Sequence, residues 1–345
     1  MEALENLKKL TSLDGVSGDE EAVREFIADK IRDYVDSLEV DACGNLIAFK
    51  KGTGEGPRVM LAAHMDEVGM MVTAVNSDGL IKFANVGGIE ARVLAGKRVR
   101  IGKNKIPGVI GLKPIHAQSA AERKGTVSKK GLTIDIGAKD REQAEAVVEI
   151  GDTVAFDYEP VEFGENKLMA KALDDRCGCA VLIELLKNRY EMDVYGCFTV
   201  QEEIGLRGAK TAAFRVMPKF ALILEGTTCY DVDGTKEYNM STWLGKGPAL
   251  TIMDRSVIND RDLLHYVMAI AEKEGIPYQF KKTISGGTDA GRIQANAEGV
   301  LVSTMAVPCR YIHTPVSIME KSDFEGMLKL ADSVLKALPE FKTDY

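Results

Sequence analysis

Apolar residues follow two different patterns along the 345-residue chain. In its first and last parts, continuous apolar runs alternate with stretches in which apolar residues recur every three or four positions, as on a helix face. The predicted helices cover residues 3–11, 20–37, 174–190, 207–214, 260–274 and 319–337, and the predicted buried strands cover 59–63, 196–200, 220–224 and 300–307. Buried strands separated by helices predict an α/β fold, a mostly parallel sheet flanked by helices. Residues 38–50 add two short strands around a turn at 42–45.

The middle of the chain has a different texture, with short apolar or alternating runs separated by glycine-containing turns. These runs lie at residues 70–75, 80–83, 98–101, 109–112, 132–136 and 153–158. Their pattern is typical of a small, mostly antiparallel β-barrel-like domain. We therefore expect an α/β domain made of residues 1–68 and 165–345, with a β-domain, 69–164, inserted into it. The basic stretch from Lys113 to Lys130 within the insert is expected to be a mobile loop.

Composition excludes several classes of protein. The formal net charge of −8 argues against general nucleic-acid binding, which needs a basic face. No apolar run approaches the length of a membrane span, so we expect no membrane partner. The six cysteines are scattered, as expected for reduced thiols in a cytoplasmic enzyme. Cys177 and Cys179 would point to opposite sides of a helix, which argues against a metal pair.

His64 directly follows the apolar run at 59–63, and Asp66 lies two residues further on. Residues two apart on an extended strand point to the same side. Asp66 can then accept the second ring N–H of His64, which is the usual arrangement behind a metal-bound histidine.

Other predicted strands end in the same way. Glu202 and Glu203 follow the strand at 197–200, Glu225 follows 221–224, His313 follows 302–307 after a short connection, and Asp174 and Asp175 open a helix. The carboxyl ends of parallel strands share one edge of a sheet, so these side chains would converge on one crevice. Imidazole and carboxylate ligands favour zinc or cobalt, and there are enough carboxylates for two ions to share one. Such a pair, roughly 3.5–4 Å apart, activates a bridging water and polarises a carbonyl.

Glu202 and Glu203 are neighbours leaving a strand, so they cannot both point the same way. One can bind metal while the other acts as the general base that moves a proton to the leaving amine. Each motif also has an ordinary explanation. Adjacent glutamates commonly complement a helix dipole, and Asp174-Asp175-Arg176 could be an N-cap with a surface ion pair. The recurrence of such motifs at the same kind of position favours the metal crevice.

These motifs together resemble the tetrahedral or glutamyl-type metalloaminopeptidases, some of which carry an endoglucanase label. The matching stretches are Ala62–Gly69, Lys171–Arg176, Gln201–Gly205 with Arg207–Ala209, Ile284–Ala290 and Arg310–Pro315, in order along the chain. The resemblance implies a zinc-peptidase-like α/β domain and two divalent metal ions per subunit. Asp174 would bridge the ions, His64 and Glu225 would complete one site, and Glu203 and His313 the other. Asp66 would orient His64, Glu202 would be the general base, and the Asp174–Asp175 peptide could be cis.

Further expectations come from the same resemblance. The inserted domain would mediate a homodimer that assembles into a dodecamer. Gly286, Gly287 and Asp289 would border the substrate pocket, with Asp289 near the free amine, although ordinary loop geometry is an equal explanation. Many relatives have aspartate where this chain has Glu225, which leaves the ligation mode and metal preference open. His116 is expected to be an exposed loop residue.

The leading hypothesis is a co-catalytic di-metal aminopeptidase that acts on short peptides. The alternatives are a di-metal amide hydrolase or deacylase on a non-peptide substrate, an endoglucanase, and a non-catalytic scaffold. Adjacent Glu202 and Glu203 lack the separation of roughly 5–9.5 Å between carboxyls that glycoside hydrolysis needs. The preferred N-terminal residue stays open; Lys246, Arg255 and Arg310 would favour an acidic side chain if they faced the pocket.

Overall fold

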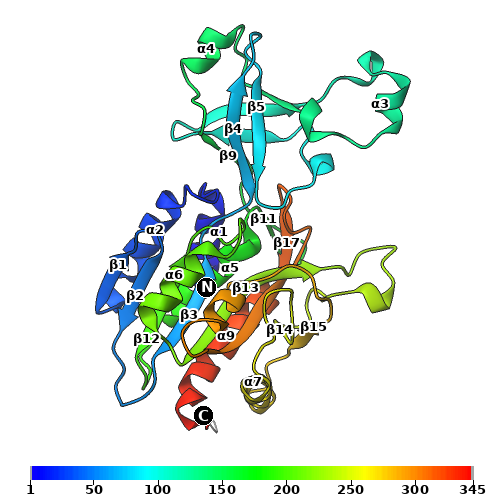
Figure 1. The fold of residues 1–345 in the computed structure, drawn as a ribbon. Coiled ribbons are helices and arrows are strands. Elements are labelled where there is room, and N and C mark those ends of the chain that lie inside the picture. Colours follow the sequence, from blue (N-terminus) through cyan, green and yellow to red (C-terminus); the bar gives the residue numbers. More distant parts are fainter. Residues whose placement is uncertain (1, 343–345) are drawn as a thin grey trace.

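The computed structural model describes residues 2–342. In this part of the chain, one large sheet has the strand order β1-β2-β12-β3-β13-β16-β17-β11-β10 (Figure 1). Beside this path, β14 (Ala249–Thr251) pairs with β16, and β15 (Gln279–Lys281) pairs with β14. Its centre is parallel and comprises β12 (Val194–Thr199), β3 (Val59–His64), β13 (Phe220–Cys229) and β16 (Leu301–Arg310). The outer strands are antiparallel: β1 (Ser37–Val40), β2 (Leu46–Lys50), β17 (Ser317–Glu320), β11 (Lys167–Ala170) and β10 (Val161–Phe163). The predicted α/β fold with a mostly parallel sheet is confirmed.

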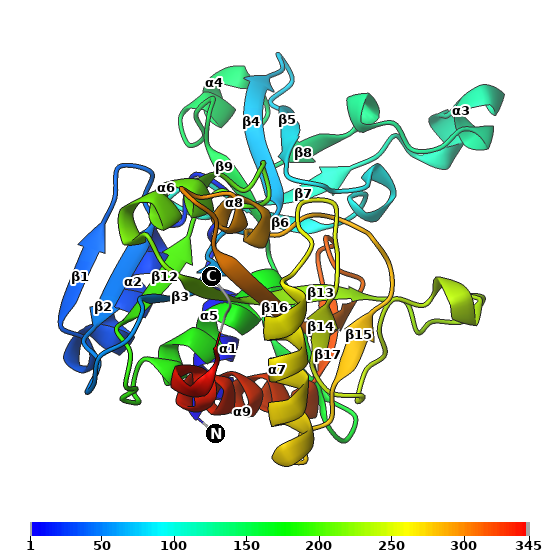
Figure 2. The same ribbon diagram turned by 60° about the horizontal axis from the view of Figure 1, so that its bottom comes forward.

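Helices cover both faces of the sheet (Figure 2). One face packs against α1 (Glu2–Ser12), α2 (Glu21–Ile31), α5 (Leu173–Leu185), α7 (Arg261–Lys273) and α9 (Lys321–Ala337), and the other against α6 (Arg207–Val216) and α8 (Ala290–Gln294). On β3, Leu61 and Ala63 pack in the first core, whereas Met60 and Ala62 pack in the second. Both faces of the strand are therefore buried, which is why its sequence is continuously apolar.

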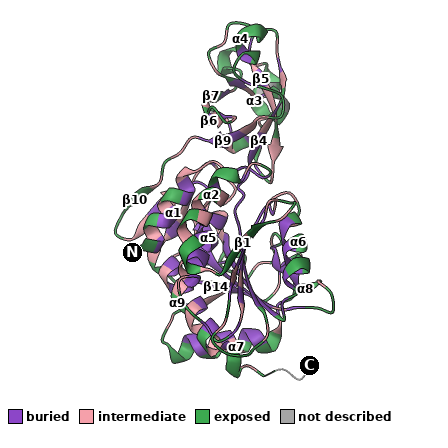
Figure 3. Ribbon diagram, turned by 90° about the vertical axis from the view of Figure 1, so that its left-hand side faces the viewer, coloured by how far each residue is buried: buried purple, intermediate pink, exposed green. Residues whose placement is uncertain are grey.

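A second, smaller body projects from the sheet (Figures 1 and 3). It is a closed barrel of β4 (Gly69–Val75), β5 (Ile81–Val86), β8 (Thr133–Asp135), β7 (Ile106–Gly111), β6 (Arg98–Ile101) and β9 (Thr153–Phe156), in this order. It has its own apolar core, to which Met70, Ile110 and Phe156 contribute. The predicted barrel is confirmed. The basic loop within it carries the short helix α3 (Ala120–Lys124), and α4 (Arg141–Glu145) precedes β9.

The proposed domain limits at 68/69 and 164/165 remain a prediction. The barrel strands lie between Gly69 and Phe156, whereas β10 pairs with β11 in the large sheet. Two salt bridges of Arg100 on β6, at 2.6 Å to Asp14 and 3.3 Å to Asp157, connect the barrel with the end of α1 and with the segment after β9.

Several predicted limits were wrong. The helix expected at 20–37 ends at Ile31, because the chain continues into a 3-10 turn, an extended Val35 and then β1. The helix expected at 174–190 ends at Leu185. The last helix begins at Lys321 because the preceding residues pair as β17. The short strands β14 (Ala249–Thr251) and β15 (Gln279–Lys281) were not predicted. Within residues 2–342, no helix is both long and apolar enough to span a membrane.

Gly178 in α5 provides a test of how closely this helix packs on the central sheet. A Cβ at this position would lie 2.5 Å from the backbone oxygen of Leu224 on β13, and equally close to the Asp175 carboxylate. Gly178→Ala is therefore expected to destabilise the metal-free protein by about 1–3 kcal/mol in denaturant unfolding, although alanine favours helices by up to about 1 kcal/mol.

Gly131→Ala is the control for this substitution. Among the described residues, apart from the two chain neighbours of Gly131, no atom lies within 4 Å of an added Cβ there, so stability should stay within about 0.5 kcal/mol of the parent protein. Equal stability of the two variants would contradict the close packing of α5 on β13.

Candidate active site

The predicted site residues come together at the carboxyl edge of the parallel strands. His64 ends β3, Glu225 lies in β13, and Glu202 and Glu203 follow β12. His313 comes after β16, and Asp174 opens α5. All of them line one cavity of 600 Å³. Their convergence follows from the shared direction of β12, β3, β13 and β16.

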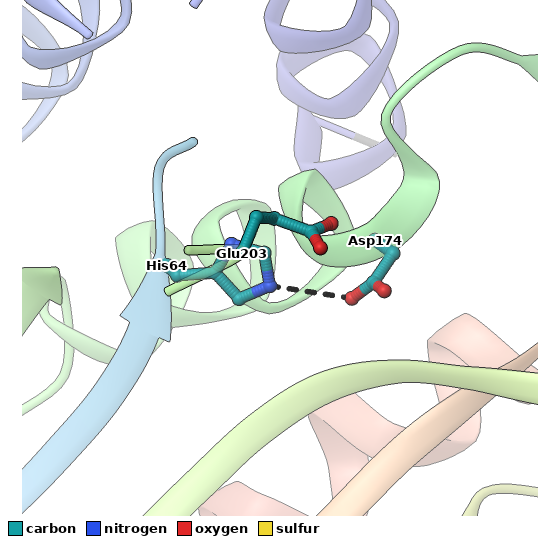
Figure 4. Close-up of side chains that lie close together, drawn as sticks. All are labelled: His64, Asp174 and Glu203. Carbon is teal, nitrogen blue, oxygen red and sulfur yellow. Dashed lines mark hydrogen bonds and ion pairs between the residues drawn. The ribbon is translucent and has the colours of Figure 1, made fainter. Parts of the chain in front are cut away.

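Asp174 lies between the two histidines. Its Oδ1 is 3.3 Å from His64 Nε2, and its Oδ2 is 3.4 Å from His313 Nε2. Glu225 Oε2 is 3.7 Å from His64 Nε2 on one side, and Glu203 Oε2 is 3.4 Å from His313 Nε2 on the other. Figure 4 shows His64, Asp174 and Glu203 facing one another. The Asp174–Asp175 peptide bond is cis.

The donor set fits divalent metal ions. One candidate ligand group is His64, Asp174 and Glu203, and a second is His64, Asp175 and Glu225, each with donor atoms within 4.8 Å of one another. Glu225 Oε1 is buried without a hydrogen-bond partner among the described residues. A buried carboxylate oxygen that lacks a protein donor is costly unless a cation satisfies it.

Asp175 differs from the other acids because the protein backbone already satisfies it. Its Oδ2 accepts a hydrogen bond of 3.1 Å from the His64 amide, and its Oδ1 accepts one of 2.9 Å from the Gly178 amide. We therefore assign Asp175 to the support of His64 rather than to the ligands.

Burial and mutual charge shift the proton affinities of the cluster. Burial raises the pKa of Glu202 and of Glu225 well above the usual range, and that of Glu203 to about 7. Burial lowers the pKa of His313, but Asp174 and Glu203 outweigh it and raise the value to about 9. In the metal-free protein, neighbouring carboxylates therefore hold His313 protonated at neutral pH.

Asp66 lies beside the ring of His64, and its role in orienting that ring remains a prediction. His64 Nδ1 lies 3.1 Å from the backbone oxygen of Asp66 and 3.4 Å from its Oδ1. The Asp66 side chain also accepts a hydrogen bond of 2.6 Å from the Ser17 hydroxyl.

Of the three residues predicted to bind substrate, two line the cavity and one does not. Gly286 and Gly287 line the cavity, whereas Asp289 is buried outside its lining. Asp289 Oδ2 accepts a hydrogen bond of 2.5 Å from the Thr199 hydroxyl, and burial raises its pKa to about 6. Its role near the free amine remains a prediction.

One basic residue of the cavity lining, Lys281, was not predicted from the sequence. Lys281 of β15 lines the cavity, and its Nζ donates a hydrogen bond of 3.1 Å to the backbone oxygen of Ser285. Arg310 instead forms two hydrogen bonds with the Asp231 carboxylate, of 2.6 and 2.8 Å. Lys246 and Arg255 are not among the lining residues either. The residues around Lys281 in the sequence do not indicate that it lies at the site, because only the pairing of β15 with β14 brings it to this edge of the sheet.

An ion cluster of Glu67, Lys171 and Arg176 was not predicted either. Lys171 Nζ donates to Glu67 Oε1 and, at 2.7 Å, to the backbone oxygen of Leu13. Arg176 Nη2 lies 3.6 Å from the same Glu67 oxygen. Glu67 follows the His64-x-Asp66 motif, and Lys171 and Arg176 flank Asp174 and Asp175. The cluster therefore ties the two ligand-bearing segments together.

Comparison with known proteins identifies the family of this chain. The family model of M42 glutamyl aminopeptidases matches residues 44–330. Lysyl aminopeptidase of Pyrococcus furiosus is 32% identical over 342 residues, which cover 97% of each chain.

Solved structures extend the likeness to the fold. The TET aminopeptidase of the archaeon Thaumarchaeota archaeon SCGC AB-539-E09 has a TM-score of 0.94 at 36% identity, covering 98% of this chain and 96% of its own. The TET1 peptidase of Pyrococcus horikoshii, described as assembling into a tetrahedron or a large octahedral shell, has a TM-score of 0.86 at 37% identity, covering 96% and 99%. A Thermotoga maritima structure named endoglucanase has a TM-score of 0.80 at 35% identity, covering 96% of both chains. The endoglucanase label expected in this group is thus confirmed. This chain belongs to the M42 glutamyl aminopeptidase family and is a peptide hydrolase.

Proposed function

We propose that the protein is a co-catalytic di-metal aminopeptidase that removes N-terminal residues from short peptides. The observation that carries the proposal is the position of Asp174, which presents one oxygen to each histidine, at 3.3 and 3.4 Å. A carboxylate placed in this way can be shared by two ions. His64 and Glu225 would complete one site, and Glu203 and His313 the other.

When bound, two divalent cations, zinc or cobalt, would supply an activated water and polarise the scissile carbonyl. Glu202 lines the same cavity but is not in either candidate ligand group, so its carboxylate is left for proton transfer. It would take a proton from the attacking water and deliver it to the leaving amine. Asp66 and Asp175 would keep His64 in place, through its ring and its amide respectively.

The acidic cavity favours a substrate with a free N-terminus, because an ammonium group gains from the surrounding carboxylates. Lys281 is a positive charge in the lining, next to Ser285. The lysyl aminopeptidase relative and the glutamyl aminopeptidase family have opposite preferences by name. Which N-terminal residue of a substrate this protein prefers therefore has to be measured.

Assembly and location are further parts of the proposal. The barrel would mediate a homodimer, and dimers would assemble into a dodecamer, in line with the tetrahedral shell described for the Pyrococcus horikoshii TET1 peptidase. All six cysteines lie in the described residues and are free, and five of them are buried. This arrangement is consistent with the expected cytoplasmic location.

A substrate panel tests the reaction class. After reconstitution with zinc or cobalt, the protein should hydrolyse aminoacyl amides and short peptides with free N-termini, and a chelator should reduce the rate to background. Matched N-acetylated substrates and a soluble cellulose derivative serve as controls. Cleavage of blocked but not free N-termini would indicate a deacylase, and chelator-resistant cellulose cleavage would indicate an endoglucanase.

Glu202→Gln tests the general base. The amide fills the same space but cannot accept the proton, so kcat should fall about 10²–10⁴-fold. Metal content should remain at two ions per chain, because Glu202 is not a proposed ligand. Glu191→Gln, an exposed site, is the matched control and should keep the parent rate. Full turnover by Glu202→Gln would require another mechanism.

Metal binding should release protons. The pKa of His313 is about 9 in the metal-free protein, whereas a metal ligand must be the neutral imidazole. Binding at pH 7 therefore displaces a proton, and the affinity should rise by up to about tenfold per pH unit as the pH approaches 9. Calorimetric titration in buffers of different ionisation enthalpy measures this release. His265→Gln on α7 should leave it unchanged, and binding at pH 7 without net proton release would contradict the prediction.

A further inference from the structure

The backbone that carries Glu202 and Glu203 is held by side chains from the first 66 residues. Four consecutive amides, those of residues 200–203, each donate to a side-chain oxygen. Val200 N donates to Asn45 Oδ1 at 3.0 Å, Gln201 N to Glu20 Oε1 at 3.2 Å, Glu202 N to Asp66 Oδ1 at 2.9 Å, and Glu203 N to Asp66 Oδ2 at 3.1 Å. Strand pairing of β12 ends at Thr199. Beyond that residue, these side chains accept the backbone hydrogen bonds that a neighbouring strand would otherwise accept.

Each accepting side chain is itself fixed. Asn45 is fully buried and donates to the Gly208 backbone oxygen at 2.9 Å. Glu20 is 5% exposed, and its Oε1 also accepts from the Gly18 amide at 2.8 Å. The acceptors therefore have defined positions before substrate arrives, as a positioning role requires.

The held segment includes an unfavourable backbone conformation. Gln201 has φ of +57°, in the left-handed region that costs free energy for a residue with a Cβ. Such a conformation persists only where the surroundings determine it. Its amide is the one that Glu20 accepts. The turn at Gln201 sets the directions of the next two side chains, so Glu203 meets His313 while Glu202 lines the cavity.

We propose that Glu20 is a positioning residue for the catalytic glutamates, with Asn45 supporting the same turn. Glu20 is not among the residues that line the cavity, and it belongs to neither candidate ligand group. It acts through the Gln201 amide, and it fixes where the proposed base and the proposed ligand Glu203 point. The inference rests on the proposed function in one respect, the role of Glu202 as base.

The predicted consequence is a change in kcat and in metal affinity rather than in substrate binding. A misplacement of about 1 Å at a catalytic group can cost about 10²-fold in rate. Glu20→Ala removes the acceptor, so kcat at saturating metal should fall about 10- to 100-fold while KM stays within about twofold. The weaker of the two metal-binding steps should lose about tenfold in affinity, because Glu203 is less well placed.

Two further substitutions separate positioning from general destabilisation. Glu20→Gln keeps an oxygen in the accepting position, so it should restore kcat to within about threefold of the parent protein. Glu20→Asp keeps the charge but withdraws the oxygen by one methylene, and it should give an intermediate loss; it also serves if Glu20→Ala does not fold. Glu21→Ala is the matched control, because Glu21 is the exposed neighbour on α2. Thermal unfolding of every variant is measured alongside.

The outcomes distinguish this inference from the proposed function. If Glu202→Gln loses turnover while Glu20→Ala and Glu20→Asp keep the parent kcat and metal affinity, the positioning role is wrong and the proposed base stands. If Glu202→Gln keeps turnover but Glu20→Ala still weakens metal binding, the positioning of Glu203 stands and the proposed base is wrong. Equal loss of kcat in Glu20→Gln and Glu20→Ala would also overturn the inference, because the accepting oxygen would then be irrelevant.

Discussion

Buried negative charge at the carboxyl edge of the large sheet is the constraint on which the rest of the site depends. Asp174, Glu203 and Glu225 gather around His64 and His313, and each has a carboxylate oxygen 3.3–3.7 Å from a histidine nitrogen. Burial and the charge of neighbouring acids raise the pKa of Glu203 and of Glu225, whereas at Asp174 the effect of burial is outweighed by hydrogen bonds from the two histidines, which lower its pKa. The two glutamates therefore keep their protons more readily than free glutamates do. Buried acids of this kind suit divalent cations, in line with the two candidate ligand groups.

Other buried acids near the site differ from Glu225 because they have partners within the protein. This difference distinguishes the proposed metal ligands from the acids that stabilise the surrounding structure. Glu67 is neutralised by Lys171 and approached by Arg176, and the Asp175 carboxylate is satisfied by two backbone amides. Glu225 Oε1 has no such donor in the described part of the chain. Glu67 and Asp175, which have protein partners, therefore hold the framework, whereas Glu225 lines the cavity and is available to an ion.

The sequence was sufficient for the central sheet and for the convergence of the site, because both depend on short-range patterns. Continuous apolar runs such as 59–63 identify buried strands, and the residues directly after parallel strands gather at one edge of the sheet. The sequence was insufficient where pairing between segments distant along the chain determines the end of a helix or the position of a side chain. The helix expected at 20–37 ended at Ile31 when the following residues joined the sheet through β1, and Lys281 reached the cavity only through the pairing of β15 with β14. Glu20 is a similar case: beside Asp19 and Glu21 it looks like an acid at the start of a helix.

Glu20 also shows why such residues lie outside the recognisable motifs. The backbone of a strand is held by hydrogen bonds to its neighbouring strands. The proposed catalytic residues Glu202 and Glu203, however, lie just beyond the paired part of β12. At that point the amides of residues 200–203 need acceptors, and an acceptor must come from an element that is already rigid. The segment between α1 and α2 meets this requirement, because the Gly15 amide donates to Glu67 at 3.0 Å and Ser17 donates to Asp66. One short segment thus contacts both acids that follow His64 and, through Glu20, the turn that carries Glu202. The geometry of the site is consequently a property of the N-terminal segment as much as of the strands that end in it.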